Sequence, residues 1–437
     1  MGWDSPIDPV WDGTYADMDE VIEVLESLSV KLSGGLTSED FENAGGAEDL
    51  VFSQDIDLAS GRVINVGNIP VNWYDCSAFG LSHGDGGASF DAIKAAIAAA
   101  AENSEDGGIV WIPPGEWALY PVEPIAIPQG VIVTGAGVGV TSLMIWMHTA
   151  SEWPVISVDG SSTSSGAFGP TLKDLTIGYK ELTGPHCRGH VGIGVSGYNC
   201  RLENVTTLGF VKGGFNVTAA RSAVFTNCNA VCYDGDFENY QEDISPHLHG
   251  WKITGGLDNS FVKCGSYNAD RAALVEGELM SKFFGCEWSG VGVLGSDGLG
   301  QVFLPMVRFR DCANVRVHGC SCINNRHGFM MEGCVSPSVV GLTCRDILEW
   351  DAKFLGTIRG RISGCSFMDV DHHLADHPDL DYYCLEIVGT HGNNAKLAPI
   401  VSGCRSAGTC RWKGSQLPQN PGVTGDLNFF ADETEIT

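Results

Sequence analysis

Acidic and aromatic side chains are concentrated between residues 233 and 288, in a pattern suited to the cleavage of polysaccharides. Hydrolysis of a glycosidic bond usually needs two carboxyl groups that flank the bond, and sugar rings stack on aromatic side chains. The carboxylates that we predict to be catalytic are Asp236, Glu238, Asp270 and Glu287. The side chains that we predict to bind substrate are Tyr233, Tyr240, Trp251, Tyr267, Arg271 and Trp288.

These residues also have simpler explanations. The chain contains 54 Asp and Glu residues, so a single carboxylate is most often a solvated surface charge. The segment from Tyr233 to Asp243 also fits a solvated acidic loop, or a Ca²⁺ site built from oxygen ligands. Trp288 follows Cys286 by two residues, and the period of two in a strand would turn both side chains inward.

A second unusual segment, residues 369–383, is rich in Asp and His. No helical spacing organises these side chains as metal ligands, so we expect an exposed loop and predict neither a metal site nor a cofactor. Arg308, Arg310 and Arg316 could neutralise a uronate in a lyase. They alternate along one predicted strand, however, and a solvated strand face explains them as well.

The elements that must position these residues recur along the chain. A frame of one apolar residue, two variable positions and a cysteine ends at Cys228, Cys264, Cys286, Cys320, Cys344, Cys365 and Cys404. Some intervals between successive cysteines are short and alike, such as that from Cys264 to Cys286, whereas that from Cys228 to Cys264 is longer. The longer intervals are either one repeat with an inserted loop or two short repeats. Short Gly-broken strands with a period of about 20–25 residues are typical of a parallel β-helix, whose stacked coils align equivalent side chains.

The 16 cysteines are therefore expected to act as small buried hydrophobes rather than as a disulfide framework. The sequence contains no CxxC pair, and its first residues lack the basic start and apolar core of a signal peptide. We accordingly predict synthesis in a reducing cytoplasm and free thiols.

The start of the repeating region has a recognisable order. Gly84-Asp85-Gly86 precedes a predicted helix from Ser89 to Asn103, and a Gly-Gly-hydrophobic stretch and Pro113-Pro114-Gly115 follow. A helix here would cover the open end of the first coil. This order resembles the opening of the pectate-lyase-like right-handed β-helix superfamily, over about Tyr74 to Lys413. The resemblance implies an all-β, right-handed parallel β-helix but no particular reaction, because the superfamily includes lyases, hydrolases and non-catalytic binders.

Residues 55–70, which include Gly61-Arg62-Val63-Ile64-Asn65-Val66, are similar to a segment found near the trimeric stalks of bacteriophage tail fibres and tailspikes. The resemblance implies a homotrimer in the virion tail, assembled in the host cytoplasm and joined to other tail or baseplate proteins through residues 1–72. Upstream, apolar residues between Met18 and Leu28 lie on one face of a predicted helix, which is either simply packed or an anchoring and trimer-contact helix.

We therefore predict a small helical attachment region at 1–72, a β-helix with its capping helix at 73–413, and a tail at 414–437. The predicted function is a tailspike that binds host surface polysaccharide and cleaves it as an endo-glycosidase, with hydrolysis favoured over lyase chemistry. The alternatives are an adhesin of the same fold and a free polysaccharide lyase. A net charge of −29 without a basic run argues against nucleic-acid binding, and no apolar stretch is long enough for membrane insertion.

Overall fold

The computed structural model describes residues 64–66, 69–102, 108–146, 153–160, 169–180, 191–210, 213–232, 249–269, 271–290, 305–368, 383–388 and 400–407. The chain divides into two units, residues 1–74 and 75–437. Strands β1 (Ile64–Val66) and β2 (Ile69–Asp75) pair antiparallel. The predicted helix near the N-terminus and the predicted tail from 414 lie outside the described residues.

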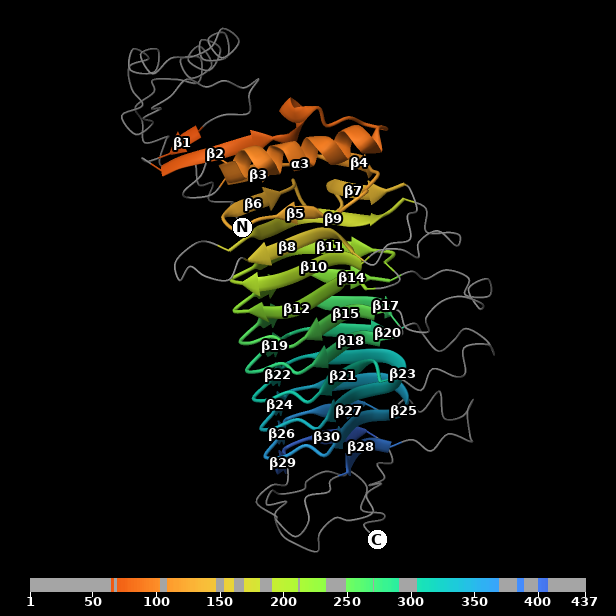
Figure 1. The fold of residues 1–437 in the computed structure, drawn as a ribbon. Helices are drawn as coiled ribbons and strands as arrows, with labels where there is room; N and C mark the ends of the chain where they lie inside the picture. The colour runs from red at the N-terminus through yellow and green to blue at the C-terminus, as the bar shows by residue number, and fades with distance from the viewer. Residues whose placement is uncertain are drawn as a thin grey trace, which may run out of the picture. The chain divides into compact units, whose positions relative to one another are not determined.

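The second unit is a stack of coils in which parallel strands form three long sheets around a common core (Figure 1). The chain passes through sheets A, B and C in that order in each coil, and each strand pairs in parallel with its equivalent in the next coil. The predicted all-β, right-handed parallel β-helix is thus confirmed.

The strands of sheet A are β5 (Ile125–Ile127), β8 (Pro154–Gly160), β10 (Val191–Tyr198), β12 (Phe215–Arg221), β15 (His249–Thr254), β18 (Arg271–Glu276), β21 (Val307–Arg310) and β28 (Tyr383–Val388). Those of sheet B are β3 (Gly108–Trp111), β6 (Val131–Thr134), β13 (Val224–Thr226), β16 (Ser260–Val262), β19 (Lys282–Phe284), β22 (Arg316–His318), β24 (Ser338–Val340), β26 (Arg361–Ser363) and β29 (Ile400–Ser402). Those of sheet C are β4 (Gly115–Leu119), β7 (Thr141–Ile145), β14 (Asn229–Val231), β17 (Gly265–Ala269), β20 (Glu287–Gly290), β27 (Ser366–Met368) and β30 (Arg405–Ala407).

Four longer strands turn a corner and contribute to two sheets. Strands β9 (Thr171–Tyr179) and β11 (Arg201–Leu208) belong to sheets B and C. Strands β23 (Ser321–Glu332) and β25 (Thr343–Leu355) belong to sheets C and A.

The strand register decides between the two explanations of the long cysteine intervals. Phe225 pairs directly with Phe261, and Phe283 pairs directly with Val317. Each of these long intervals is therefore one coil with an insertion. One member of the predicted series is wrong. Cys344 lies in sheet C opposite Cys322, and the turn position that the other frame cysteines occupy is taken in this coil by Leu342, two residues after the end of β24. The spacing misled because a second column of cysteines runs beside the first.

The remaining frame cysteines occupy the turn between sheets B and C. The residue before each of them has a positive φ, +52° at Lys263 and +60° at Gly285, which explains why glycine is frequent there. Thirteen cysteines whose side chains the structure describes are all buried, and none of them forms a disulfide. The inward position predicted from the sequence is confirmed for the cysteines within the coils; Cys76 lies outside them, in the short 3-10 helix η2 (Cys76–Phe79).

We expect these thirteen thiols to resist a polar alkylating reagent in the native protein and to react once it is unfolded. A polar reagent does not reach a thiol that is buried in the folded protein, and at Cys200 burial also raises the pKa, to about 11, which keeps the thiol protonated. Mass spectrometry after native-state and denatured-state labelling would measure this. Labelling of most of these thiols in the folded protein would contradict the burial.

Aromatic side chains form a second internal column. The rings of Phe225, Phe261 and Phe283 stack with centroid separations of 4.7 and 4.6 Å. Trp251 stacks on Phe215 at 4.0 Å, and its indole N–H donates to the carbonyl of Gly265. Offset aromatic stacking therefore adds to apolar burial in holding neighbouring coils in register.

The predicted capping helix is present as α3 (Gly86–Glu102). It begins three residues earlier than predicted because the carboxylate of Asp85 accepts hydrogen bonds from the backbone N–H groups of Gly87 and Ala88. Its buried face includes Phe90, Ile93, Ala96, Ile97 and Ala100. A Cβ on Gly86 would lie 2.6 Å from the ring of Tyr120, so the helix can pack this closely only with glycine there.

Candidate functional site

Several of the long insertions follow one corner of the β-helix. Residues 233–248 join β14 to β15, residues 291–304 join β20 to β21, and residues 369–382 join β27 to β28. Each insertion therefore leads from sheet C to sheet A. We call the described residues on both sides of this connection the C–A corner. They are the part of the surface where a substrate would meet both the rigid coils and the insertions.

Two of the predicted site residues lie together on sheet C, near the turn from sheet B rather than at this corner. Glu287 is exposed and pairs in register with Gly265 of the preceding coil. The Tyr267 ring folds over Gly265, where an added Cβ would lie 2.9 Å from its hydroxyl oxygen. Burial, and then the negative charge of Glu287, raise the pKa of Tyr267. A carboxylate and a neutral phenol thus face the solvent side by side.

Arg271 begins β18 on the sheet A side and is only 6% exposed. Its Nε has no hydrogen-bond partner, and no described residue forms an ion pair with its guanidinium. Burial, followed by the charge of Arg308, lowers its pKa. The negative charge of Glu276 offsets part of this effect without forming an ion pair, so the buried guanidinium can still accept a negative group.

Arg271 belongs to a row of polar and aromatic side chains at the start of the sheet A strands. His249 pairs in register with Arg271, and further along the stack His327 pairs with Trp350, which pairs with Tyr383. The rings of His327 and Trp350 stack at 5.0 Å, and the ammonium of Lys353 lies 5.9 Å from the Trp350 ring centroid. Apart from Arg271, the sequence analysis did not identify the members of this row. In the sequence, each member of the row stands two residues before an inward-facing apolar residue of a sheet A strand, and this spacing could have identified it.

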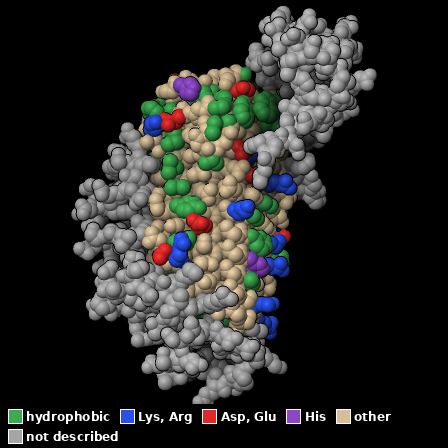
Figure 2. Space-filling view, turned by 180° about the vertical axis from the view of Figure 1, so that it is seen from behind, with side chains coloured by type: hydrophobic (Ala, Val, Ile, Leu, Met, Phe, Trp, Pro, Cys, Tyr) green, Lys and Arg blue, Asp and Glu red, His purple; other side chains and the backbone are tan. Residues whose placement is uncertain are grey.

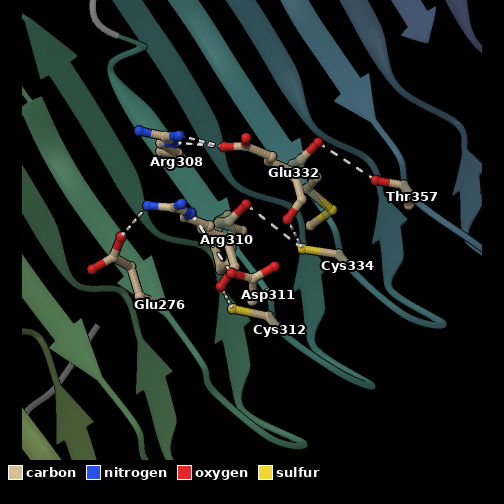
Figure 3. A network of polar contacts seen from close by, with 10 residues as sticks. Glu276, Arg308, Arg310, Asp311, Cys312, Glu332, Cys334 and Thr357 are labelled. Carbon is tan, nitrogen blue, oxygen red and sulfur yellow. Dashed lines mark hydrogen bonds and ion pairs between the residues drawn. The ribbon is translucent and has the colours of Figure 1, made fainter. Parts of the chain in front are cut away.

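The outer face of sheet A continues from this row as a network of ion pairs, drawn in Figure 3. Arg308 donates from Nε to Glu332 at 3.1 Å, and Arg310 lies 3.7 Å from Glu276 and 3.6 Å from Asp311. Lys353 pairs with Glu386 in the next coil. The charges of Arg308 and Arg310 are therefore already balanced. This favours the strand-face explanation of these arginines over the uronate-neutralising one.

Glu278, in contrast, is a structural carboxylate. It is fully buried and accepts hydrogen bonds from the backbone N–H of Gly256 at 2.6 Å and from the Asn259 amide at 3.1 Å. The Ser281 hydroxyl also donates to it. Burial raises its pKa despite these donors. Its contacts hold the turn between sheets A and B.

The structure corrects two of the predicted substrate-binding residues. Trp251 and Trp288 are only 2% and 3% exposed, and their rings pack against Phe261 and Phe283 inside the coils. Neither can serve as a stacking platform for a sugar. The physical reason is the period of two, which turns Trp288 and the buried residues of its column to the same side.

The remaining predicted residues cannot be placed in the structure. Those that lie outside the described residues are Tyr233, Asp236, Glu238, Tyr240 and Asp270. By chain connectivity, residue 270 joins Tyr267's strand to Arg271's strand, and residues 233–240 precede β15. Among the described residues, no cluster of three or more His, Cys, Asp and Glu side chains could hold a metal ion. In the same part of the chain, no helix is both long and apolar enough to cross a membrane.

Comparisons with known proteins agree with this architecture. No protein-family model matches the chain, and no curated protein sequence matches it. Among solved structures, DFA-IIIase from Arthrobacter chlorophenolicus A6 is similar at 12% identity and a TM-score of 0.54, over 79% of this chain and 87% of that one.

The gp42 tailspike of Acinetobacter phage vb_AbaP_AS12 is similar at 11% identity and a TM-score of 0.53. The match covers 79% of this chain but only 58% of that tailspike. At such low identities the similarity concerns the course of the backbone and not the chemistry of the site. Together with the three parallel sheets, it shows that the chain has the right-handed parallel β-helix fold.

Proposed function

We propose that this protein is a bacteriophage tailspike whose β-helix binds a host surface polysaccharide at the C–A corner and hydrolyses it. The observation that carries the proposal is the corner itself. Arg271 begins β18 at this corner, directly after residue 270, and the insertion that contains residues 236 and 238 leads into β15, the neighbouring strand of sheet A. Tyr267 and Glu287 lie on the adjoining sheet C. The stalk-like segment at 55–70, and a solved tailspike of the same fold, support the virion context.

In the proposed reaction, Glu287 is one of two carboxyl groups that flank the glycosidic bond. One carboxylic acid protonates the leaving oxygen, and the second carboxylate activates water or attacks the sugar directly. The partner of Glu287 is Asp236, Glu238 or Asp270. Carboxylates on neighbouring coils can lie about 5–10 Å apart, which is the separation that such hydrolysis needs.

The proposed assembly is a homotrimer attached to other tail proteins through residues 1–72. Three chains would present three equal glycan-binding faces, and avidity would multiply a weak affinity. Light scattering of the full-length protein at micromolar concentration should give the mass of a trimer. A monomer under these conditions would contradict the assembly.

Digestion of purified host polysaccharide tests the function and separates it from its alternatives. Hydrolysis produces new reducing ends without ultraviolet absorbance, whereas a lyase produces an unsaturated uronate that absorbs. Binding of the glycan with neither product would identify a non-catalytic adhesin. Absence of both binding and cleavage with the glycan of the correct host would reject the proposal.

Arg271 gives a test that combines stability with binding. Arg271→Met should raise the free energy of unfolding by about 1–3 kcal/mol, because it removes a buried cation that forms no ion pair with any described residue. The same substitution should weaken glycan binding. Arg308→Met is the matched control: it breaks the ion pair with half-buried Glu332 and should lower stability by up to about 1 kcal/mol. Chemical denaturation and binding assays measure both effects. A loss of stability in Arg271→Met would show that its charge is compensated in solution.

A further inference from the structure

The outer face of sheet B is basic, although the chain as a whole carries 54 acidic and 25 basic residues. From β13 to β26, the outward positions of the sheet B strands include Lys282, Arg316 and Arg361 but no carboxylate. Exposed Lys263 and Arg359 lie in the adjacent turns. Figure 2 shows Lys and Arg side chains following one another along one edge of this unit, with hydrophobic side chains and a histidine between them.

Most of these cations form no ion pair within the described part of the chain. Lys282 pairs with Asp258 at 2.7 Å, but Arg316, Arg359 and Arg361 form no ion pair with any described residue. The pKa of neighbouring His318 is lowered by burial and then by the charge of Arg316. Unpaired positive charge is therefore concentrated on this face of an otherwise acidic protein.

The register arranges the cations as a column along the stack. Lys282 pairs with Arg316, which pairs with Ser338, which pairs with Arg361. At about 4.8 Å per strand, Arg316 and Arg361 are separated by about 10 Å along the stack. A linear polymer with regularly spaced anionic groups can pair with such a column, whereas a single small anion could use only one member of it.

Apolar and aromatic side chains form a parallel column on the same face. Half-buried Val262, Phe284, His318 and Val340 occupy the second outward position of successive strands. The Phe284 and His318 rings meet edge to face at 5.5 Å. Sugar rings contact such surfaces, while carboxylates pair with guanidinium groups. The two columns together fit a polymer that is both saccharide and anionic.

We propose that the outer face of sheet B is a second glycan-contact surface and that it takes an acidic polysaccharide lying along the stack. Carboxylates of the polymer pair with Arg316, Arg359 and Arg361. The inference rests on the proposed function to the extent that the ligand is a glycan. It adds the charge of that glycan and a contact surface separate from the C–A corner.

The test uses polygalacturonate as an immobilised polyanion and its fully methyl-esterified form as the neutral counterpart. The full-length protein should bind the acid form, and added salt should weaken the binding. The double variant Arg316→Glu/Arg361→Glu should bind about tenfold more weakly or worse, because two attractions become repulsions. The matched control Lys94→Glu/Lys180→Glu changes the net charge equally at exposed positions elsewhere and should bind within about twofold of the unchanged protein.

Four outcomes would overturn the inference. One is that the unchanged protein does not bind polygalacturonate, and another is that Arg316→Glu/Arg361→Glu binds it normally. Equal binding of the methyl ester would reject the acidic class while leaving glycan binding intact. A smaller mass of the double variant in light scattering, without weaker polyanion binding, would show that this face contacts a second copy of the chain. Digestion of host glycan reports on the C–A corner independently, so failure of the proposed function is distinguishable from failure of this inference.

Discussion

Glu287→Gln is expected to lower the rate of polysaccharide cleavage by about 10²–10⁴-fold while folding and glycan binding remain nearly unchanged. The amide keeps the size and hydrogen bonding of the side chain but can neither transfer a proton nor attack the sugar. Glu287 is exposed on a rigid strand, so its replacement leaves no buried group without a partner. Reducing-end release from host glycan at saturating and limiting substrate would measure the loss.

The comparison variants define what this result means. Glu203→Gln removes another exposed carboxylate, from sheet B, and should leave activity unchanged. We also expect the three remaining carboxylate variants to differ in activity. One of them should lose about as much cleavage activity as Glu287→Gln, and the other two should lose less; these variants are Asp236→Asn, Glu238→Gln and Asp270→Asn. Full activity in all four candidate variants would move the site elsewhere, such as into a groove between subunits.

Cys286→Asp is expected to lower the free energy of unfolding by about 3–5 kcal/mol, because it places an unpaired charge inside the coil stack. Cys286 is 1% exposed, and its sulfur lies 3.4 Å from the carbonyl oxygen of Phe261. A hydrogen bond with Cys320 and burial raise the pKa of its thiol well above the usual value. The same surroundings would disfavour a carboxylate.

The pH dependence distinguishes buried charge from simple misfit. The introduced carboxyl would have a raised pKa in the folded state, so folding would favour its protonated form. The destabilisation should therefore be smallest below about pH 4, the pKa of an unfolded aspartate, and grow as the pH rises toward about 8. Cys286→Ala is the control, and its cost should be about 1 kcal/mol and independent of pH. An equal, pH-independent cost for both variants would mean that water reaches this position.

The β-helix could be predicted because its evidence is local and repeated. Each frame contains an apolar strand residue, a turn position with positive φ and a small buried cysteine. Because the coils stack in register, the same residue types are required at equivalent positions of successive coils. The misassignments arose where two columns resembled each other. Cys344 has the spacing of the turn cysteines but belongs to sheet C, and Trp288 has the neighbours of a binding residue but faces inward.

The candidate site was less predictable, since its members come from different coils. His327 and Trp350 are distant in the sequence and meet only because β23 and β25 pair with a shift in register. Arg271 and Glu287 could be nominated from composition, but the absence of an ion pair between Arg271 and any described residue depends on its surroundings. Insertions of unequal length hide such relations until the strands are aligned.

The register of the coils also has a consequence for how such a gene can change. Phe261 pairs with Phe283, and Val317 with Val339, so a coil without an insertion corresponds to an uninterrupted block of codons of nearly constant length. Duplication or loss of one block would shift everything downstream by one strand spacing and preserve every pairing. The insertions between sheets C and A enter at one point of each block. Recombination can therefore exchange them between relatives without disturbing the coils, which lets the surface diversify while the scaffold is inherited intact.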